Sequence, residues 1–224
     1  MNTQFDYVCV ITSAISPDPL YSLIDPKTRY AQTLSTIDSI RKYIPNCFII
    51  LTEATVLPSQ AVAELTSKVD SYISLCDRRI VQKFNSTSAK GQNETYMMLV
   101  ALDRIRELGI TCRRVFKIAG RYELTEGFDL SYYNNVLGKF VFKTHIPSHY
   151  YDNEFSLHTR LWSFCGTSID KAGLLFQNLL ITMMTANRDV EHAFYMLLGA
   201  DDYVEFEWIG VKGYLGLLNI FVEE

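Results

Sequence analysis

Residues 7–12 read YVCVIT and residues 47–52 read CFIILT, and these two stretches decide the fold class. Each is continuously apolar, a pattern typical of a strand buried on both faces, as in a parallel sheet. Two more strand candidates lie at residues 69–75 and 113–119, and helical periodicity separates the four strands at residues 28–43, 58–68 and 90–108. Strand and helix therefore alternate three times before a fourth strand. This order predicts an α/β fold with right-handed crossovers and a mainly parallel sheet flanked by helices.

The second half of the chain has a different pattern. We expect strands, antiparallel to one another, at residues 139–144 and 157–165, helices at 168–185 and 189–198, and a final strand at 203–211. A smaller antiparallel portion is thus expected in the C-terminal half. Because the sequence has no internal repeat, low-complexity tract or linker, we expect residues 1–224 to form one domain.

The composition is globular, with 48% hydrophobic and 21% charged residues. A net charge of −4 gives no electrostatic reason to expect a nucleic acid or an anionic membrane as partner. The sequence shows neither a signal peptide nor a membrane span, and its five cysteines form no CxxC motif. We expect reduced thiols and a cytoplasmic location, in a bacterium or in a virus-infected host cell.

Polar residues follow each predicted parallel strand, where ligands of open α/β sheets collect. They lie at residues 12–16, 52–53, 77–79 and 120–123. The most specific feature is Gly120-Arg121-Tyr122: glycine permits a close backbone approach, and Lys117 and Arg121 place positive charge near the strand end. The pattern favours a phosphate-bearing ligand, although a surface turn would look the same.

Common catalytic signatures are missing from the sequence. There is no GxGxxG, no GxxxxGK[ST] and no GxSxG, which argues against a Rossmann dehydrogenase, a P-loop NTPase and an α/β-hydrolase. Carboxylates that could act as a general base are Glu191 and Asp202. Each has a simpler interpretation: Glu191 suits a helix start, and Asp202, next to Asp201, suits a solvated loop.

Three segments carry a resemblance to a known family. They are RYAQTL at 29–34 with SIR at 39–41 and Pro45, KG at 90–91 with Glu94, and FKIAGRY at 116–122. In these segments the chain resembles compact GT-A-type glycosyltransferases, of the kind found in surface-polysaccharide gene clusters and in large viruses. The resemblance runs from residue 5 to about residue 130.

The resemblance implies a GT-A/Rossmann-like fold and a nucleotide-sugar donor bound at the carboxyl ends of the first strands. Residues 1–130 would bind that donor, and residues 131–224 would receive a glycan acceptor, near Trp162 or Glu191. The implied donor contacts are Thr12, Ser13 and Arg29 for the nucleotide, Asp77 for base or ribose, and Lys90, Lys117 and Arg121 for the diphosphate.

One departure from the family pattern concerns the metal. Many GT-A enzymes carry Asp-x-Asp after the fourth strand to hold Mg²⁺ or Mn²⁺ under the diphosphate, whereas this chain has Gly120-Arg121-Tyr122-Glu123. Since charge builds on the leaving diphosphate, a cation must offset it. Our hypothesis is that Arg121 and Lys117 replace the metal, with Glu123 or Asp129 as the remaining candidate metal ligands.

Two other classes of function stay open on the sequence. A non-catalytic glycan- or protein-binding module on a degenerate transferase fold would also lack Asp-x-Asp. A nucleotidyltransferase would share the sheet, but it would carry a Gly-rich, basic loop after the first strand, and residues 12–19 have no such loop.

Overall fold

A twisted sheet of seven strands forms the centre of the molecule in the computed structural model, which describes residues 3–87, 89–148, 151, 154–215 and 220–224. From one edge to the other the strands are β10 (Tyr203–Phe206), β8 (Phe140–Pro147), β9 (Phe155–Cys165), β6 (Arg114–Ala119), β2 (Tyr7–Ser13), β3 (Cys47–Glu53) and β4 (Ser71–Ser74). Neighbours pair in parallel except on the two sides of β9, which runs against both β6 and β8. The predicted mainly parallel α/β sheet is confirmed.

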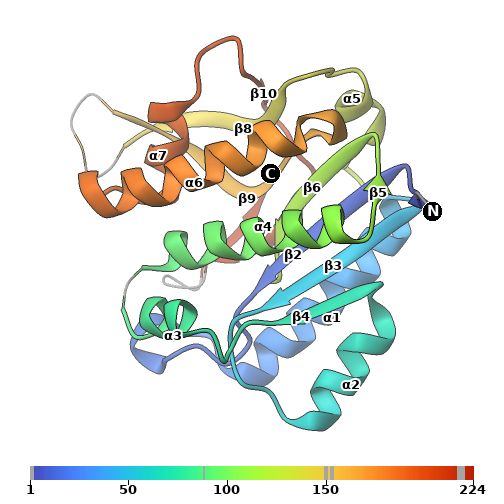
Figure 1. Ribbon diagram of the computed structural model, residues 1–224, viewed down its shortest axis with the longest axis vertical. Coiled ribbons are helices and arrows are strands. Elements are labelled where there is room, and N and C mark those ends of the chain that lie inside the picture. The colour runs from blue at the N-terminus through green and yellow to red at the C-terminus, as the bar shows by residue number, and fades with distance from the viewer. Residues whose placement is uncertain (1–2, 88, 149–150, 152–153, 216–219) are drawn as a thin grey trace.

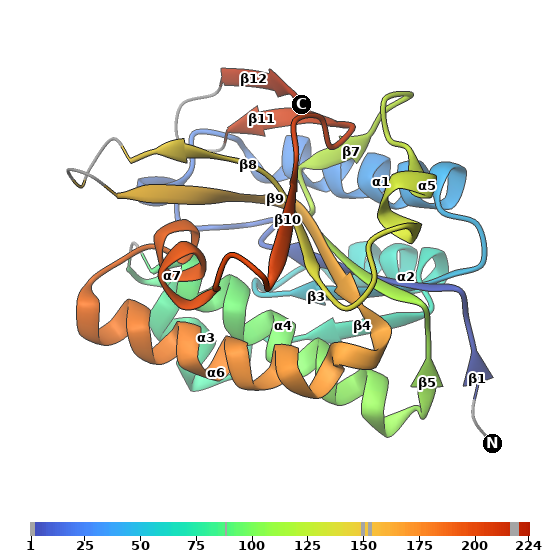
Figure 2. The same cartoon turned by 90° about the horizontal axis from the view of Figure 1, so that it is seen from above.

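Helices cover both faces of this sheet (Figures 1 and 2). One face packs against α1 (Pro26–Tyr43) and α2 (Ser59–Lys68), and the other against α4 (Lys90–Glu107), α6 (Ile169–Ala186) and α7 (Val190–Leu197). Short helices complete the fold: α3 (Arg79–Asn85), α5 (Leu130–Asn134), η1 (Pro19–Tyr21) and η2 (Gly166–Ser168). The helices predicted from periodicity are present within about two residues of their predicted ends, whereas the short helices α3 and α5 were not predicted.

The strands owe their continuous apolar character to this double cover. In β2, Tyr7, Cys9 and Ile11 face α1, while Val8 and Val10 face α4, and all five side chains are buried. Side chains alternate across a strand, so a strand covered on both faces needs apolar residues at every position.

A smaller antiparallel sheet lies over α1 and the end of β6. Its strands are β12 (Ile220–Glu223), β11 (Val211–Leu215) and β7 (Tyr122–Leu124), and Figure 2 shows it above the large sheet. A further pair, β1 (Thr3–Gln4) and β5 (Ile110–Thr111), is parallel. The single strand expected at residues 203–211 is therefore wrong. It divides into β10 and β11 in different sheets, because the chain turns between them at Gly210, where φ is +73°.

Gly210 is expected to be among the least replaceable residues of that turn. An alanine there would hold a left-handed conformation, and its Cβ would overlap the backbone of Phe128. Gly210→Ala should lower the free energy of unfolding by about 2–4 kcal/mol, measured by urea denaturation. Gly138→Ala is the matched control: φ is +69° but the added Cβ meets nothing within 4 Å, so only about 1–2 kcal/mol is expected. Equal losses in the two variants would contradict the role given to the overlap.

The aromatic side chains mainly build the core. Trp162 is 1% exposed and lies among Phe142, Phe176 and Phe194. The expectation that an acceptor approaches Trp162 is therefore wrong, because this ring is enclosed between β8, α6 and α7. All five cysteines are free thiols, as expected. Among the described residues, no helix is both long and apolar enough to cross a membrane.

Candidate functional site

A pocket of about 460 Å³ opens where β2 and β6 end. Its floor includes Thr12 and Ser13 from β2 and Gly120 from the turn after β6. Helices α1, α3, α4 and α7 contribute the walls, so the pocket draws on both halves of the chain. The volume lies in the range of sites that enclose a small organic ligand, roughly 300–1,000 Å³.

Gly120 allows the two strand ends to meet α1 closely. A Cβ at this position would lie 3.2 Å from the Thr33 hydroxyl and 3.3 Å from the Cβ of Ser13. Thr33 donates to the carbonyl of Gly120 at 3.0 Å, which fixes the turn that carries Arg121. The glycine thus serves the close backbone approach expected of it.

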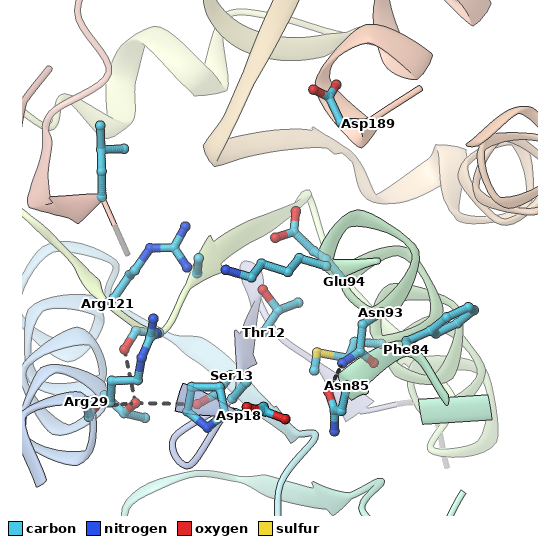
Figure 3. A pocket seen from close by; sticks show the side chains of 18 of the residues that line it. Thr12, Ser13, Asp18, Arg29, Phe84, Asn85, Asn93, Glu94, Arg121 and Asp189 are labelled. Atoms are coloured by element: carbon cyan, nitrogen blue, oxygen red, sulfur yellow. Dashed lines mark hydrogen bonds between the residues drawn. The ribbon is translucent and has the colours of Figure 1, made fainter. Parts of the chain in front are cut away.

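Positive side chains gather on the pocket wall next to α1 and the end of β6. Figure 3 shows Arg29 and Arg121 on the same side of the pocket, and Lys90, the first residue of α4, also lines it. The hydroxyl of Ser22 accepts from Nε and Nη2 of Arg29, at 3.1 and 2.9 Å, and so orients the guanidinium. Burial, and next the charge of Arg121, lower the pKa of Arg29 to about 10.

Carboxylates come from the loop after β2, from α4 and from the start of α7. Asp18, Glu94, Asp189 and Glu191 line the pocket. Glu94 forms an ion pair with the buried Lys117 at 2.6 Å, and Glu191 accepts from the Thr159 hydroxyl at 2.8 Å. Burial, followed by the charges of Asp189 and Glu94, raises the pKa of Glu191. A carboxyl group with a raised pKa in a pocket is a candidate for proton transfer.

Two asparagines form a third side of the pocket. Asn85 donates to the carbonyl of Ala54 at 2.8 Å and accepts from Asn93 at 2.7 Å. Figure 3 shows this pair across the pocket from Arg29 and Arg121. The remaining amide oxygen of Asn93 is buried and has no hydrogen-bond partner among the described residues, and the same is true of the Thr12 hydroxyl. Buried polar atoms of this kind are satisfied when a polar ligand binds.

Glu53 shapes the loop that follows β2. Its buried carboxylate accepts from the backbone N–H groups of Ile15 and Thr55, at 3.1 and 2.8 Å. Burial raises the pKa of this carboxyl group, while the hydrogen bonds act in the opposite direction. Glu53 does not line the pocket, and it positions the residues after Ser13 that do.

Most of the site residues predicted from the sequence meet in this pocket: Thr12, Ser13, Arg29, Lys90, Arg121 and Glu191. Three others lie elsewhere. Asp77 is in the turn between β4 and α3, and Asp202 pairs with Lys171 at 2.6 Å and accepts from the N–H of Gly199 at 3.0 Å. The Lys171 hydrogen bond lowers the pKa of Asp202, which makes this residue a loop anchor and a poor base.

Lys117 is the third residue that the structure places differently. Its side chain is fully buried on the α4 face of β6, where it pairs with Glu94 and donates to the carbonyl of Thr159 at 2.6 Å. It therefore stands behind the pocket wall and does not face a ligand. Burial lowers its pKa, and Glu94 opposes that effect.

Several lining residues were not predicted, among them Asn85, Asn93 and Asp189. Nothing in the local sequence distinguishes the two asparagines from ordinary helix residues. Asp189 could have been identified as a helix N-cap, because Asp is a preferred residue directly before a helix. It caps α7 by accepting from the backbone N–H of His192 at 2.9 Å.

No family model and no curated protein matches the chain. Two crystal structures of the glycosyltransferase GlyE from Streptococcus pneumoniae TIGR4 are similar in fold. The first has a TM-score of 0.55 and 12% sequence identity, and the apo form has 0.53 and 11%. Each match covers 92% of this chain and 46% of GlyE, so the chain spans less than half the length of that protein.

A third structure is a glycosyltransferase involved in the glycosylation of the major capsid of PBCV-1. It is 6% identical, with a TM-score of 0.49, and this similarity is too weak to bear on the fold. The GlyE structures are enough for the architecture: the chain shares their α/β fold, and the fold implied by the resemblance in its sequence is confirmed.

Proposed function

We propose that the protein is a glycosyltransferase that moves a sugar from a nucleotide-sugar donor to a hydroxyl group of a glycan. One observation carries the proposal: cations and a carboxyl group with a raised pKa share one pocket at the carboxyl ends of parallel strands. Cations suit the diphosphate of the donor, and the carboxyl group suits an acceptor hydroxyl.

The donor lies with its diphosphate against Arg29, Lys90 and Arg121. Its remaining polar groups reach the orphaned oxygens of Thr12 and Asn93, both of which need a hydrogen-bond partner. This assignment keeps the predicted donor contacts Thr12, Ser13, Arg29, Lys90 and Arg121, and it leaves out Asp77 and Lys117, which do not line the pocket.

Glu191 serves as the general base. Its carboxylate takes the proton of the acceptor hydroxyl while that oxygen attacks the anomeric carbon, and the bond between this carbon and the phosphate oxygen breaks. The bond electrons leave with the nucleoside diphosphate. The Thr159 hydroxyl holds one oxygen of Glu191 at 2.8 Å, which leaves the other for the acceptor. Asp202 is not given this role, because it is paired with Lys171.

Thermal-shift measurements with UDP-, GDP-, CMP- and dTDP-sugars test the proposal. A donor at one hundred times its dissociation constant should stabilise the protein by about 2.7 kcal/mol, or roughly 5–11 °C for a chain of this size. The donor that stabilises the protein should also be hydrolysed slowly without acceptor. If no donor produces a shift, the protein is a non-catalytic module and the proposal is wrong.

A further inference from the structure

We infer that the pocket neutralises the donor diphosphate with Arg29, Lys90 and Arg121 and requires no divalent cation. This inference rests on the proposed function and adds the chemistry of its phosphate site. The argument has three steps: the metal-binding segment of the fold lacks suitable ligands, the other pocket carboxylates are already engaged, and the cations are arranged as an anion site.

The segment after β6 does not fit a metal. Arg121 points into the pocket (Figure 3), Tyr122 is buried at 1% exposure, and Glu123 pairs with Lys212 at 3.1 Å, outside the pocket. Asp129, the other candidate ligand, caps α5 by accepting from the N–H of Ser131 at 2.8 Å. Thus, where Asp-x-Asp would supply two carboxylates, this chain supplies a guanidinium.

The carboxylates that do line the pocket have other partners. Asp18 accepts from the backbone N–H of Leu20 at 2.9 Å. Glu94 is held by Lys117, and Glu191 is held by Thr159. Asp189 accepts from the N–H of His192 at 2.9 Å and lies 2.5 Å from Nδ1 of that ring. Within the described residues, no group of three or more His, Cys, Asp or Glu side chains is arranged to hold a metal ion.

The two arginines, by contrast, have no counter-ion of their own. Among the described residues, neither Arg29 nor Arg121 has a carboxylate within ion-pair distance. The Nε of Arg121 is buried and has no hydrogen-bond partner among the residues that the structure describes. A buried N–H donor in this position is costly unless a ligand supplies the acceptor.

Two of the three cations are repelled by their neighbours. For Arg121, burial acts to lower the pKa, but Tyr122, followed by the charges of Glu94 and Glu191, outweighs burial and raises it. Burial, and next the charges of Arg121 and Arg29, lower the pKa of Lys90. Arg29 is affected in the same way by burial and by Arg121. Such a cluster is stabilised by a bound anion, and α4 adds to it because the helix begins at Lys90 and its N-terminal end carries partial positive charge.

The charges match the expected ligand. A sugar nucleotide carries two negative charges on its diphosphate, and a third develops on the leaving oxygen as the glycosidic bond breaks. Three fixed cations can offset that third charge, which is the contribution otherwise made by a metal ion.

Isothermal titration calorimetry tests the inference with UDP, GDP, dTDP, CMP and inorganic pyrophosphate, each in EDTA and in Mg²⁺. We expect one nucleoside diphosphate to bind with the same Kd, within two-fold, under both conditions, and pyrophosphate to bind in EDTA. Binding of the diphosphates only with Mg²⁺ would overturn the inference but leave the proposed function intact. Binding of CMP alone would also overturn it, since CMP has no diphosphate.

The two proposals can fail separately. If pyrophosphate binds in EDTA while no nucleotide or sugar nucleotide binds under any condition, the anion site stands and the proposed function is wrong. If neither pyrophosphate nor any nucleotide binds under either condition, both are wrong.

Variants locate the site. Arg121→Met should weaken binding of the nucleoside diphosphate about 10- to 100-fold, since a hydrogen bond to a charged group contributes about 1.5–3 kcal/mol, and Mg²⁺ should not restore it. Arg121→Lys keeps the charge and should lose less, which separates loss of charge from misfolding. Lys90→Met should also weaken binding, whereas Lys83→Met, an exposed change on α3 outside the pocket, should not. Unchanged binding by Arg121→Met would contradict the inference.

Discussion

Glu191→Gln is expected to lower kcat by about 10²–10⁴ while the Kd of the donor stays within about three-fold. General-base catalysis contributes a factor of this size, and the amide can keep the hydrogen bond from Thr159 but cannot take a proton. Initial rates with the donor identified by thermal shift give kcat, and calorimetry gives the Kd.

Asp202→Asn is the matched control for Glu191→Gln. It makes the same chemical change at the other carboxylate that the sequence offered as a base, and it should leave kcat within about two-fold because Asp202 lies at Lys171 and not in the pocket. A large loss in Asp202→Asn together with normal turnover in Glu191→Gln would reverse the assignment.

The pH dependence of turnover follows from the same residue. Burial and the nearby Asp189 and Glu94 raise the pKa of Glu191 above its ordinary value of 4.5. Because the base must be ionised, kcat should fall as the pH drops through this raised pKa, at a higher pH than for an exposed glutamate.

The free energy of unfolding depends on pH in the opposite direction to kcat. The folded state prefers the protonated carboxyl group, so ionisation of Glu191 destabilises the protein as the pH rises from the unfolded-state pKa to the folded one. Relative to the wild type, Glu191→Gln should therefore gain stability over that interval, as measured by urea denaturation at several pH values.

Lys117→Met should lower the free energy of unfolding by about 3 kcal/mol. Removing one partner of a buried ion pair leaves the other without compensation and typically costs about 3–5 kcal/mol. We expect the lower end because the Glu94 side chain keeps 22% exposure, whereas that of Lys117 has none. Urea denaturation measures the loss, and Lys83→Met is the exposed control.

A second substitution separates the charge effect from a packing effect. In the double variant Lys117→Met/Glu94→Gln no charge is left unpaired, so stability should return to within about 1 kcal/mol of the wild type. If the double variant is as unstable as Lys117→Met, the ion pair is not the reason for the loss.

The parallel half of the fold was predictable mainly because β2 and β3 begin with continuous apolar runs, at residues 7–11 and 47–51. Both strands are covered on both faces of the sheet. The small sheet was not predictable. β7 and β11 are three and five residues long, and they pair across about ninety positions of sequence, from Leu124 with Val211 to Tyr122 with Gly213. Local patterns hold no information about such distant pairing.

The site was predictable to the extent that strand ends define it. Thr12, Ser13 and Arg121 follow directly from the ends of β2 and β6. The predicted role of Lys117 was wrong because the positive charge near Gly120 was interpreted as a contact to the ligand diphosphate. A lysine inside a strand covered on both faces has to be buried and paired, and this reasoning from RVFKIA would have pointed to a partner on a covering helix.

The reversed direction of β9 gives the two sides of the site separate supports in the fold. Since β9 runs against β6, its first residues extend beyond the edge where β6 ends, and Thr159 comes to Glu191 from there. The β8–β9 hairpin can therefore be lengthened or exchanged without moving the strand ends that carry Thr12 and Gly120. Under the proposed function, the donor side of the pocket would thus be built independently of the hairpin that borders its acceptor side.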